Sequence, residues 1–208
     1  MDRIPRTATV AISAFTALAW LIASIAFPGE AAMVLGFTPA RMSGADVPWA
    51  AVPAVLTPLT ATIAHSGLVH IGFNLLILVW CGMAVERVLG TGGLIILYFV
   101  GAYAAAAGQW IADPMGTIPM IGASGAISAV LGAYSLSFGR ARQVTRSVRV
   151  NRWLNSAWLL VAWVGLQLAI GWLADVQGVL LATPAHIGGF LAGLLLQRPL
   201  LLWRYRKA

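Results

Sequence analysis

The chain has 208 residues, of which 60% are hydrophobic and 9% are charged, and its mean hydropathy is +0.87. Because soluble domains carry about 25% charged residues, this composition excludes a soluble globular protein and indicates an integral membrane protein in a lipid bilayer. The formal net charge of +7 lies in short segments between apolar stretches, which is typical of membrane orientation signals and gives no reason to expect a nucleic-acid partner.

The first apolar stretch, residues 8–27, follows a short polar start that carries Arg3 and Arg6. It has about the 20 residues that a helix needs to cross a bilayer. It is also longer than the usual core of a signal peptide, so we expect a retained transmembrane helix. Residues 28–58 contain five prolines and several ions, and they predict an ordered loop that lies partly in the membrane interface.

Two further transmembrane helices are predicted over residues 62–85 and 94–111. The first of them runs from about Leu68, and its earlier residues are a possible entry segment. The charged pair Glu86-Arg87 and the glycine-rich residues 90–93 separate the two helices. An irregular connection with two prolines follows the second of these helices.

The fourth predicted helix, residues 124–138, is short. At about 1.5 Å per residue it spans roughly 22 Å, against about 30 Å for the hydrocarbon core. One end must therefore stop inside the membrane. That end carries Ser124, because five arginines follow the other end: Arg140, Arg142, Arg146, Arg149 and Arg152.

The last two helices are predicted over residues 154–173 and 183–203, and a basic tail follows them. Six helices place both termini on one side, and the positive-inside rule makes that side cytoplasmic. The end with Ser124 then faces outward. We expect a single membrane domain over residues 1–208, in a prokaryotic inner membrane, and the sequence does not indicate its oligomeric state.

A serine between glycines, Gly122-Ala123-Ser124-Gly125, begins the fourth helix. Glycines allow a tight turn and a close approach of another chain. The start of a helix also directs unpaired N–H groups toward its surroundings. This geometry suits a nucleophile beside an oxyanion site, although small residues in membrane helices also serve packing alone.

A possible base for this serine is His186, because Gly189 and Gly193 lie on the same helical face as this histidine. Ser124 has a matching stripe in Ser128 and Gly132. Two such stripes can pack backbone to backbone and bring the histidine to the serine, as a serine–base pair requires. The alternative is helix packing with an incidental histidine.

A second polar cluster contains His65, His70 and Asn74. His70 and Asn74 are four residues apart, so they share a helical face and could both donate hydrogen bonds to a developing oxyanion. A polar bridge between helices and a proton relay are the alternatives. His65 lies more than a turn earlier and is expected only in a supporting position.

These motifs together resemble the rhomboid family of intramembrane serine proteases. They are His-x4-His-x3-Asn in residues 65–74, Gly-x-Ser-Gly in residues 122–125, and Ala-His-x-x-Gly-x-x-x-Gly in residues 185–193. The resemblance implies an all-α, polytopic bundle of six transmembrane helices, in which the short fourth helix carries the nucleophile. It also implies a serine endopeptidase that cleaves transmembrane or membrane-proximal peptide bonds near the outer face.

The resemblance implies a role for each residue of the site. Ser124 would be the nucleophile and His186 the general base, in a dyad without an acidic member. His70, Asn74 and the Ser124 N–H would bind the oxyanion, and Gly122 would shape the loop. Neither a cofactor nor a metal is expected, and Cys81, the one cysteine, matches no metal-site spacing.

The sequence departs from the family pattern at Ser128, where many members have a tyrosine that stacks on the histidine. The histidine must then be oriented by something else, such as a contact at Gly189. Gln167 lies in the middle of the fifth predicted helix, where it could bond a neighbour, and no role is assigned to it. The Trp-Arg pair common in the family's first outer loop is also not recognisable.

Two other function classes fit parts of the sequence. A catalytically silent rhomboid-like protein would bind membrane helices without cutting them, although every expected catalytic residue is retained. A transporter would use the histidines as a proton relay. The transporter hypothesis leaves the Gly-x-Ser-Gly motif unexplained.

Overall fold

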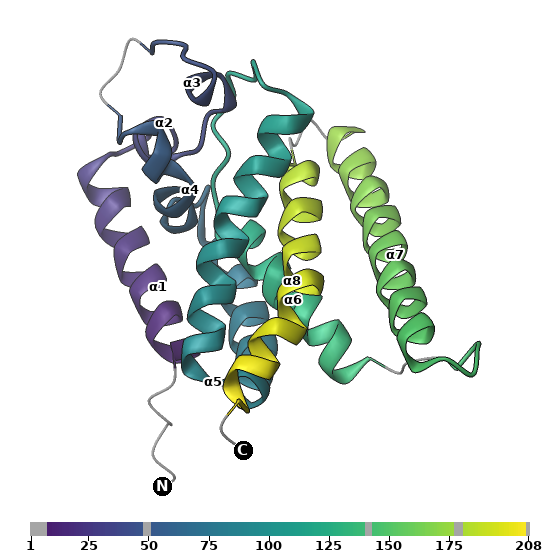
Figure 1. Ribbon diagram of the computed structural model, residues 1–208. Helices are drawn as coiled ribbons and strands as arrows, with labels where there is room; N and C mark the ends of the chain where they lie inside the picture. Colours follow the sequence, from purple (N-terminus) through teal and green to yellow (C-terminus); the bar gives the residue numbers. More distant parts are fainter. Residues whose placement is uncertain (1–7, 48–50, 140–142, 177–180, 207–208) are drawn as a thin grey trace, which may run out of the picture.

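The computed structural model describes residues 8–47, 51–139, 143–176 and 181–206. Among these residues all regular elements are helices, and most of the long ones stand side by side in one bundle (Figure 1). Expectations that concern Arg3, Arg6, Arg140, Arg142 and Lys207 fall outside the described residues.

Three described helices are long and apolar enough to cross a membrane: α1 (Ala8–Ala26), α5 (Leu68–Ala112) and α8 (Thr183–Arg204). The helix α5 contains both the second and the third predicted helix. Its 45 residues are interrupted at Gly90, which has φ 77° and ψ 166°. Only glycine adopts this backbone conformation readily, so Gly90 divides α5 into two arms. Leucines of both arms enter the same hydrophobic core.

The helix α5 begins at Leu68, as expected, and the possible earlier entry at residue 62 is wrong. A short 3-10 turn, η2 (Ala61–Ile63), and a non-helical segment precede it. The carbonyl groups that a longer helix would use are bonded elsewhere. Gly122 N–H donates to the carbonyl of Ala61 over 2.8 Å, and the Nδ1 atom of His65 lies 3.4 Å from the carbonyl of Ile63.

The segment after α1 is ordered over its described residues, 28–47 and 51–58, and its place in the membrane interface stays a prediction. It forms the short helices α2 (Ala31–Leu35), α3 (Pro39–Met42), η1 (Ala54–Leu56) and α4 (Thr57–Thr60). Phe37, which is 2% exposed, forms a two-way backbone bridge with Met120. This bridge attaches the first connection to the segment that leads to Ser124.

The helix α6 (Ser124–Phe138) has 15 residues and lies between α5 and α8. The helix α7 (Val148–Val176) lies at the edge of the bundle (Figure 1). It begins six residues before the predicted start at 154, because Ser147 begins the helix: its Oγ accepts the N–H of Val150, and its carbonyl accepts the N–H of Asn151. Arg149 and Arg152 therefore belong to the helix and not to a loop.

Glycines bring α6 and α8 into backbone contact. A Cβ atom on Gly189 would overlap the carbonyl oxygen of Gly125, and one on Gly193 would overlap the carbonyl oxygen of Ala129. A Cβ atom on Gly132 would in turn overlap the carbonyl oxygen of Phe190. The small-residue stripes predicted from the sequence therefore face each other across this interface.

The start of α1 is fixed by the carboxylate of Glu86. It accepts the N–H groups of Ala8 and Thr9 over 2.7 and 2.9 Å, and the hydroxyl groups of Thr9 and Thr91 over 2.7 and 2.9 Å. A carboxylate at a helix N-terminus satisfies unpaired N–H groups and interacts favourably with the helix dipole. This buried charge therefore joins α1 to α5.

We expect Gly193→Leu to lower the stability of the protein strongly. The new side chain would push α8 away from the backbone of α6, and overpacking of a tight interface costs up to about 3 kcal/mol. The thermal midpoint of the detergent-solubilised protein measures the effect. Gly165→Leu on α7 is the matched control, because a Cβ atom at Gly165 meets nothing within 4 Å. Equal midpoints for the two variants would contradict the packing argument.

Candidate active site

Ser124 and His186 meet where α6 and α8 begin. Ser124 is the first residue of α6, and His186 lies in the first turn of α8. The Oγ atom of Ser124 is 2.8 Å from the Nε2 atom of His186. The backbone contact between the two helices brings their first turns together, and the side chains join there in a hydrogen bond.

The other nitrogen of this histidine contacts α7. The Nδ1 atom of His186 lies 3.0 Å from the Oε1 atom of Gln167, whose side chain is only 5% exposed. An amide oxygen only accepts hydrogen bonds, so the proton of a neutral His186 belongs on Nδ1. Nε2 is then free to accept the hydrogen of the Ser124 hydroxyl. A histidine that acts as a general base toward a serine needs this tautomer.

Trp163 holds α7 against α8 one turn before Gln167. Its indole Nε1–H donates to the carbonyl of His186 over 3.3 Å. Its ring also stacks on Phe190 with 4.9 Å between ring centroids and 12° between planes. These contacts position the part of α7 that carries Gln167.

The turn before Ser124 depends on Gly122, which has φ 107°. A side chain is strained in this conformation, and here it would also collide with a neighbour. A Cβ atom on Gly122 would lie 2.6 Å from the Nε2 atom of His70 and 3.7 Å from the Oγ atom of Ser124. The glycine therefore allows the imidazole of His70 to approach the turn beside the serine.

His70 is held with a defined tautomer. Its Nδ1 atom accepts the N–H of Ser66 over 3.4 Å and lies 3.2 Å from the Ser66 hydroxyl. The proton of a neutral His70 therefore belongs on Nε2, the atom that faces Gly122. Asn74 lies one turn further along α5, where its Nδ2 atom donates to the carbonyl of His70 over 2.9 Å.

His65 supports the turn. Its Nε2 atom accepts the N–H of Ala123 over 3.4 Å. Its ring lies edge-on to the ring of His70, with 4.9 Å between centroids. His65 is thus buried between the start of α5 and the Gly122 turn, and the contacts described for it do not include Ser124.

Ser128 does not orient His186. Its hydroxyl donates to the carbonyl of Ser124 on the same helix over 2.8 Å. Gly189 packs on the backbone of Gly125. The side chain described next to His186 Nδ1 is the amide of Gln167. In the sequence it was visible only as a lone glutamine among apolar residues. The described part of the chain contains no group of three or more His, Cys, Asp or Glu residues that could hold a metal ion.

The family model of the Rhomboid domain matches residues 53–203. The chain is 27% identical over 136 residues to rhomboid protease GluP of Bacillus subtilis, and the alignment covers 65% of this chain and 24% of that protein. It is 29% identical over 138 residues to RHOMBOID-like protein 5 of Arabidopsis thaliana, covering 66% and 41%. It is 32% identical over 134 residues to rhomboid protease GlpG of Pectobacterium atrosepticum, covering 64% and 44%.

The aligned part of the chain spans less than half the length of each of these relatives. The range that the family model matches, however, contains the Gly122 turn, both helix starts and all three histidines. With most of its length matched by this model, the chain belongs to the rhomboid family.

Proposed function

We propose that the protein is an intramembrane serine endopeptidase with Ser124 as nucleophile and His186 as general base. The observation that carries this proposal is the 2.8 Å hydrogen bond between Ser124 Oγ and His186 Nε2, with Gln167 on the opposite nitrogen. A nucleophile, its base and a group that orients the base are the three parts of an activated serine. The names of the bacterial relatives, which are rhomboid proteases, support the same activity.

The reaction would begin when Ser124 Oγ attacks a peptide carbonyl and His186 Nε2 takes its proton. The protonated Nε2 then gives this proton to the leaving amine, which leaves an acyl-enzyme on Ser124. A water molecule, deprotonated by the same nitrogen, then attacks the ester, and Nε2 returns this proton to Ser124 Oγ as the acid product leaves. Gln167 would accept the Nδ1–H throughout and so keep the imidazole ring of His186 in one orientation.

Three donors are available for the oxyanion of the tetrahedral intermediates. The N–H of Ser124 belongs to the first turn of α6, where N–H groups have no acceptor within the helix. The Nε2–H of His70 faces the Gly122 turn. Asn74 would supply a further amide N–H from the next turn of α5. Donors aimed at a developing charge contribute several kcal/mol in known enzymes.

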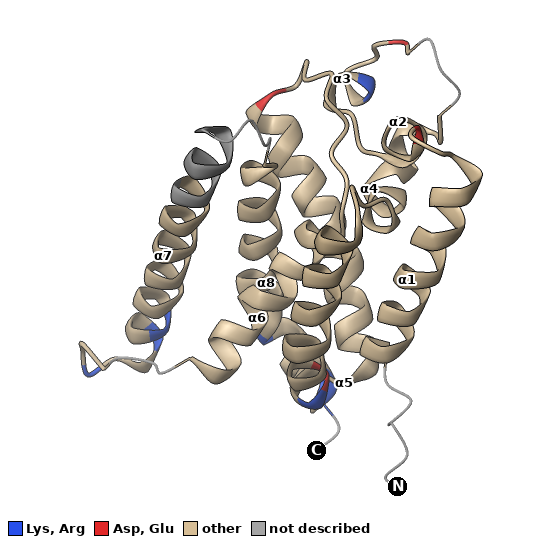
Figure 2. Ribbon diagram, turned by 180° about the vertical axis from the view of Figure 1, so that it is seen from behind, with Lys and Arg blue, Asp and Glu red and all other residues tan. Residues whose placement is uncertain are grey.

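The proposal includes the membrane topology. A short α6 would end within the bilayer at Ser124, so that cleavage takes place near the outer face of a six-helix domain that spans residues 1–208. Apart from Arg41, the described arginines lie at the end of the bundle where α1 begins (Figure 2). The positive-inside rule makes that end cytoplasmic. Transmembrane proteins would be the substrates, and the bacterial relatives favour an inner membrane.

A fluorophosphonate serine probe tests the proposal without knowledge of the substrate. We expect the detergent-solubilised wild type to be labelled, and Ser124→Ala and His186→Ala to lose the label. Ser135→Ala is the matched control on α6, since the Ser135 hydroxyl bonds the carbonyl of Gly132 within its own helix. Undiminished label in Ser124→Ala would refute the assignment. A folded but unlabelled wild type would favour a catalytically silent, helix-binding protein.

We expect Gln167 to act as a positioning residue, so Gln167→Leu should slow the labelling reaction by about 10- to 100-fold. Without the acceptor oxygen, His186 is no longer held in the tautomer that accepts the serine proton. Gln167→Glu retains an acceptor at the same place and should restore most of the rate. The readout is the second-order rate constant of labelling, with the thermal midpoint measured in parallel.

The matched control for Gln167→Leu is Gln109→Leu. Gln109 is a half-buried amide on α5, and its Oε1 atom has no hydrogen-bond partner among the described residues. This variant should label at the wild-type rate. If both leucine variants slow labelling equally, or if Gln167→Glu fails to restore it, Gln167 has only a structural role.

A further inference from the structure

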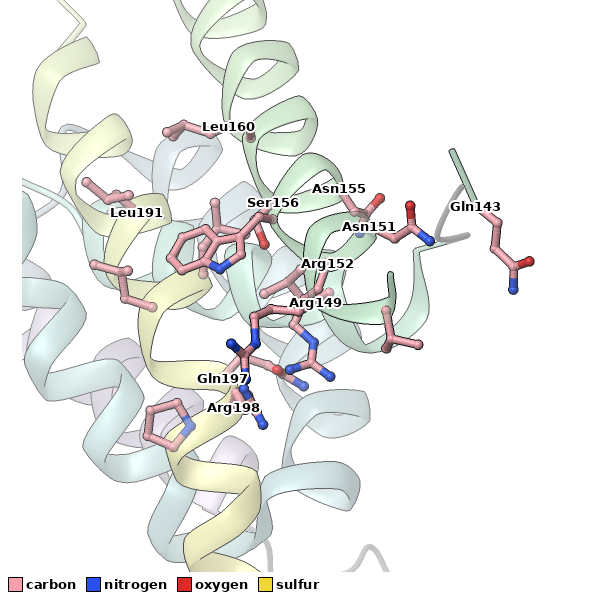
Figure 3. Close-up of a pocket in the computed structure, with 17 residues that line it drawn as sticks. Gln143, Arg149, Asn151, Arg152, Asn155, Ser156, Leu160, Leu191, Gln197 and Arg198 are labelled. Carbon is pink, nitrogen blue, oxygen red and sulfur yellow. The ribbon is translucent and has the colours of Figure 1, made fainter. Parts of the chain in front are cut away.

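A cavity of about 830 Å³ lies between the beginning of α7 and the last turns of α8. Figure 3 shows its side chains, which come mainly from these two helices. Arg198 in the cavity and His186 are 12 residues apart on α8, or about 18 Å along the helix. The basic end of the cavity is therefore remote from the Ser124–His186 pair, whereas its apolar end reaches Leu191, five residues from His186 on α8. The volume lies within the range of about 300–1,000 Å³ typical of ligand sites.

One wall of the cavity is apolar. It is formed by leucines from three helices: Leu136 on α6, Leu160 on α7, and Leu191, Leu194 and Leu195 on α8. The cavity exists because α7 is joined to α8 at the level of Trp163 and Gln167, nearer the other end of the bundle. Towards its own beginning α7 diverges from α8, as Figure 1 shows.

Basic side chains also line the cavity. Arg149 and Arg152 reach it from α7, and Arg198 reaches it from α8 (Figure 3). The side-chain amides of Asn155 and Gln197 accompany them. None of the described residues that line the cavity is acidic. The guanidinium groups are thus available to an anion from outside the chain.

The acidic residue described at this end of the bundle is Glu86, and it does not neutralise the arginines of the cavity. Its carboxylate already accepts four hydrogen bonds, from Ala8, Thr9 and Thr91. The other acidic side chains that the structure describes lie at the opposite end (Figure 2). None of the acidic side chains that the structure describes therefore balances the positive charge of the cavity.

We propose that this cavity binds an anionic phospholipid, with its phosphate among Arg149, Arg152 and Arg198 and an acyl chain along the leucine wall. Arginine suits phosphate because its planar fork donates two parallel hydrogen bonds. Basic pockets between membrane helices at a positively charged end of a bundle bind anionic head groups in general. A free phosphate ion would satisfy the arginines and leave the leucine wall unfilled, so the combination of the two surfaces selects a lipid.

Native mass spectrometry of the full chain in detergent tests this proposal. The probes are phosphatidylglycerol, phosphatidylcholine with the same acyl chains, and inorganic phosphate. We expect phosphatidylglycerol to bind in a saturable one-to-one complex, with phosphatidylcholine at least about tenfold weaker. Inorganic phosphate at the same concentration should not displace the lipid. Displacement by phosphate, or equal binding of the two lipids, would overturn the proposal.

The double variant R149Q/R198Q removes one cavity arginine from α7 and one from α8. We expect it to weaken phosphatidylglycerol binding roughly 30-fold. The matched control is R146Q/R206Q, which makes the same change in net charge with two arginines that do not line the cavity. The control should change the affinity by less than about threefold. An equal loss in both variants would show nonspecific charge attraction and would contradict a site.

The leucine wall is tested by Leu160→Trp, which fills the cavity and leaves every arginine in place. We expect it to reduce phosphatidylglycerol binding by about tenfold or more through loss of space for the acyl chain. The thermal midpoint of each variant establishes that it is folded. Unchanged lipid binding in a folded Leu160→Trp variant would exclude the acyl-chain position.

Discussion

The backbone contact between α6 and α8 is the constraint on which the rest of the structure depends. In a bilayer no hydrophobic force draws apolar helices together, so close packing of small residues has to hold them. Gly189 and Gly193 supply the surface of α8 that lies on the carbonyl groups of α6. The same register brings the first turns of the two helices together, and the hydrogen bond between Ser124 and His186 follows from it.

The segments around this pair differ in how firmly they are attached. The turn before Ser124 is bonded on several sides: Met120 to Phe37, Gly122 to Ala61, and Ala123 to His65. Chain segments far apart in the sequence therefore meet at the proposed nucleophile and fix its backbone. The helix α7 lies at the edge of the bundle and reaches the site through Gln167 and Trp163. The proposed nucleophile thus lies on the tightly bonded core, whereas the residue proposed to orient the base comes from a peripheral helix.

The sequence predicted the parts of the fold that local pattern determines. The starts of α6 at Ser124 and of α8 at Thr183 agree with the predicted ones, because a small-residue or proline signal precedes an apolar run at each place. The start of α5 at Leu68 also agrees, whereas the earlier entry at residue 62 does not form, because a hydrogen bond from a residue distant in the sequence competes with the helix there. The partner of Gln167 was not predictable either. Periodicity shows that a glutamine lies on an apolar helix, but only packing decides which residue it meets.

The helix α7 carries both an arginine of the cavity, Arg152, and the partner of His186, Gln167. Arg152 and Gln167 are 15 residues apart, or about 22 Å along the helix. The hydrogen bond between Gln167 and His186 is 3.0 Å long, and a displacement of only about 0.5 Å takes such a contact out of hydrogen-bonding range. A lipid in the cavity fills the space into which the beginning of α7 could otherwise tilt. The position of that lipid and the orientation of the proposed base are then mechanically linked, although no side chain connects them directly.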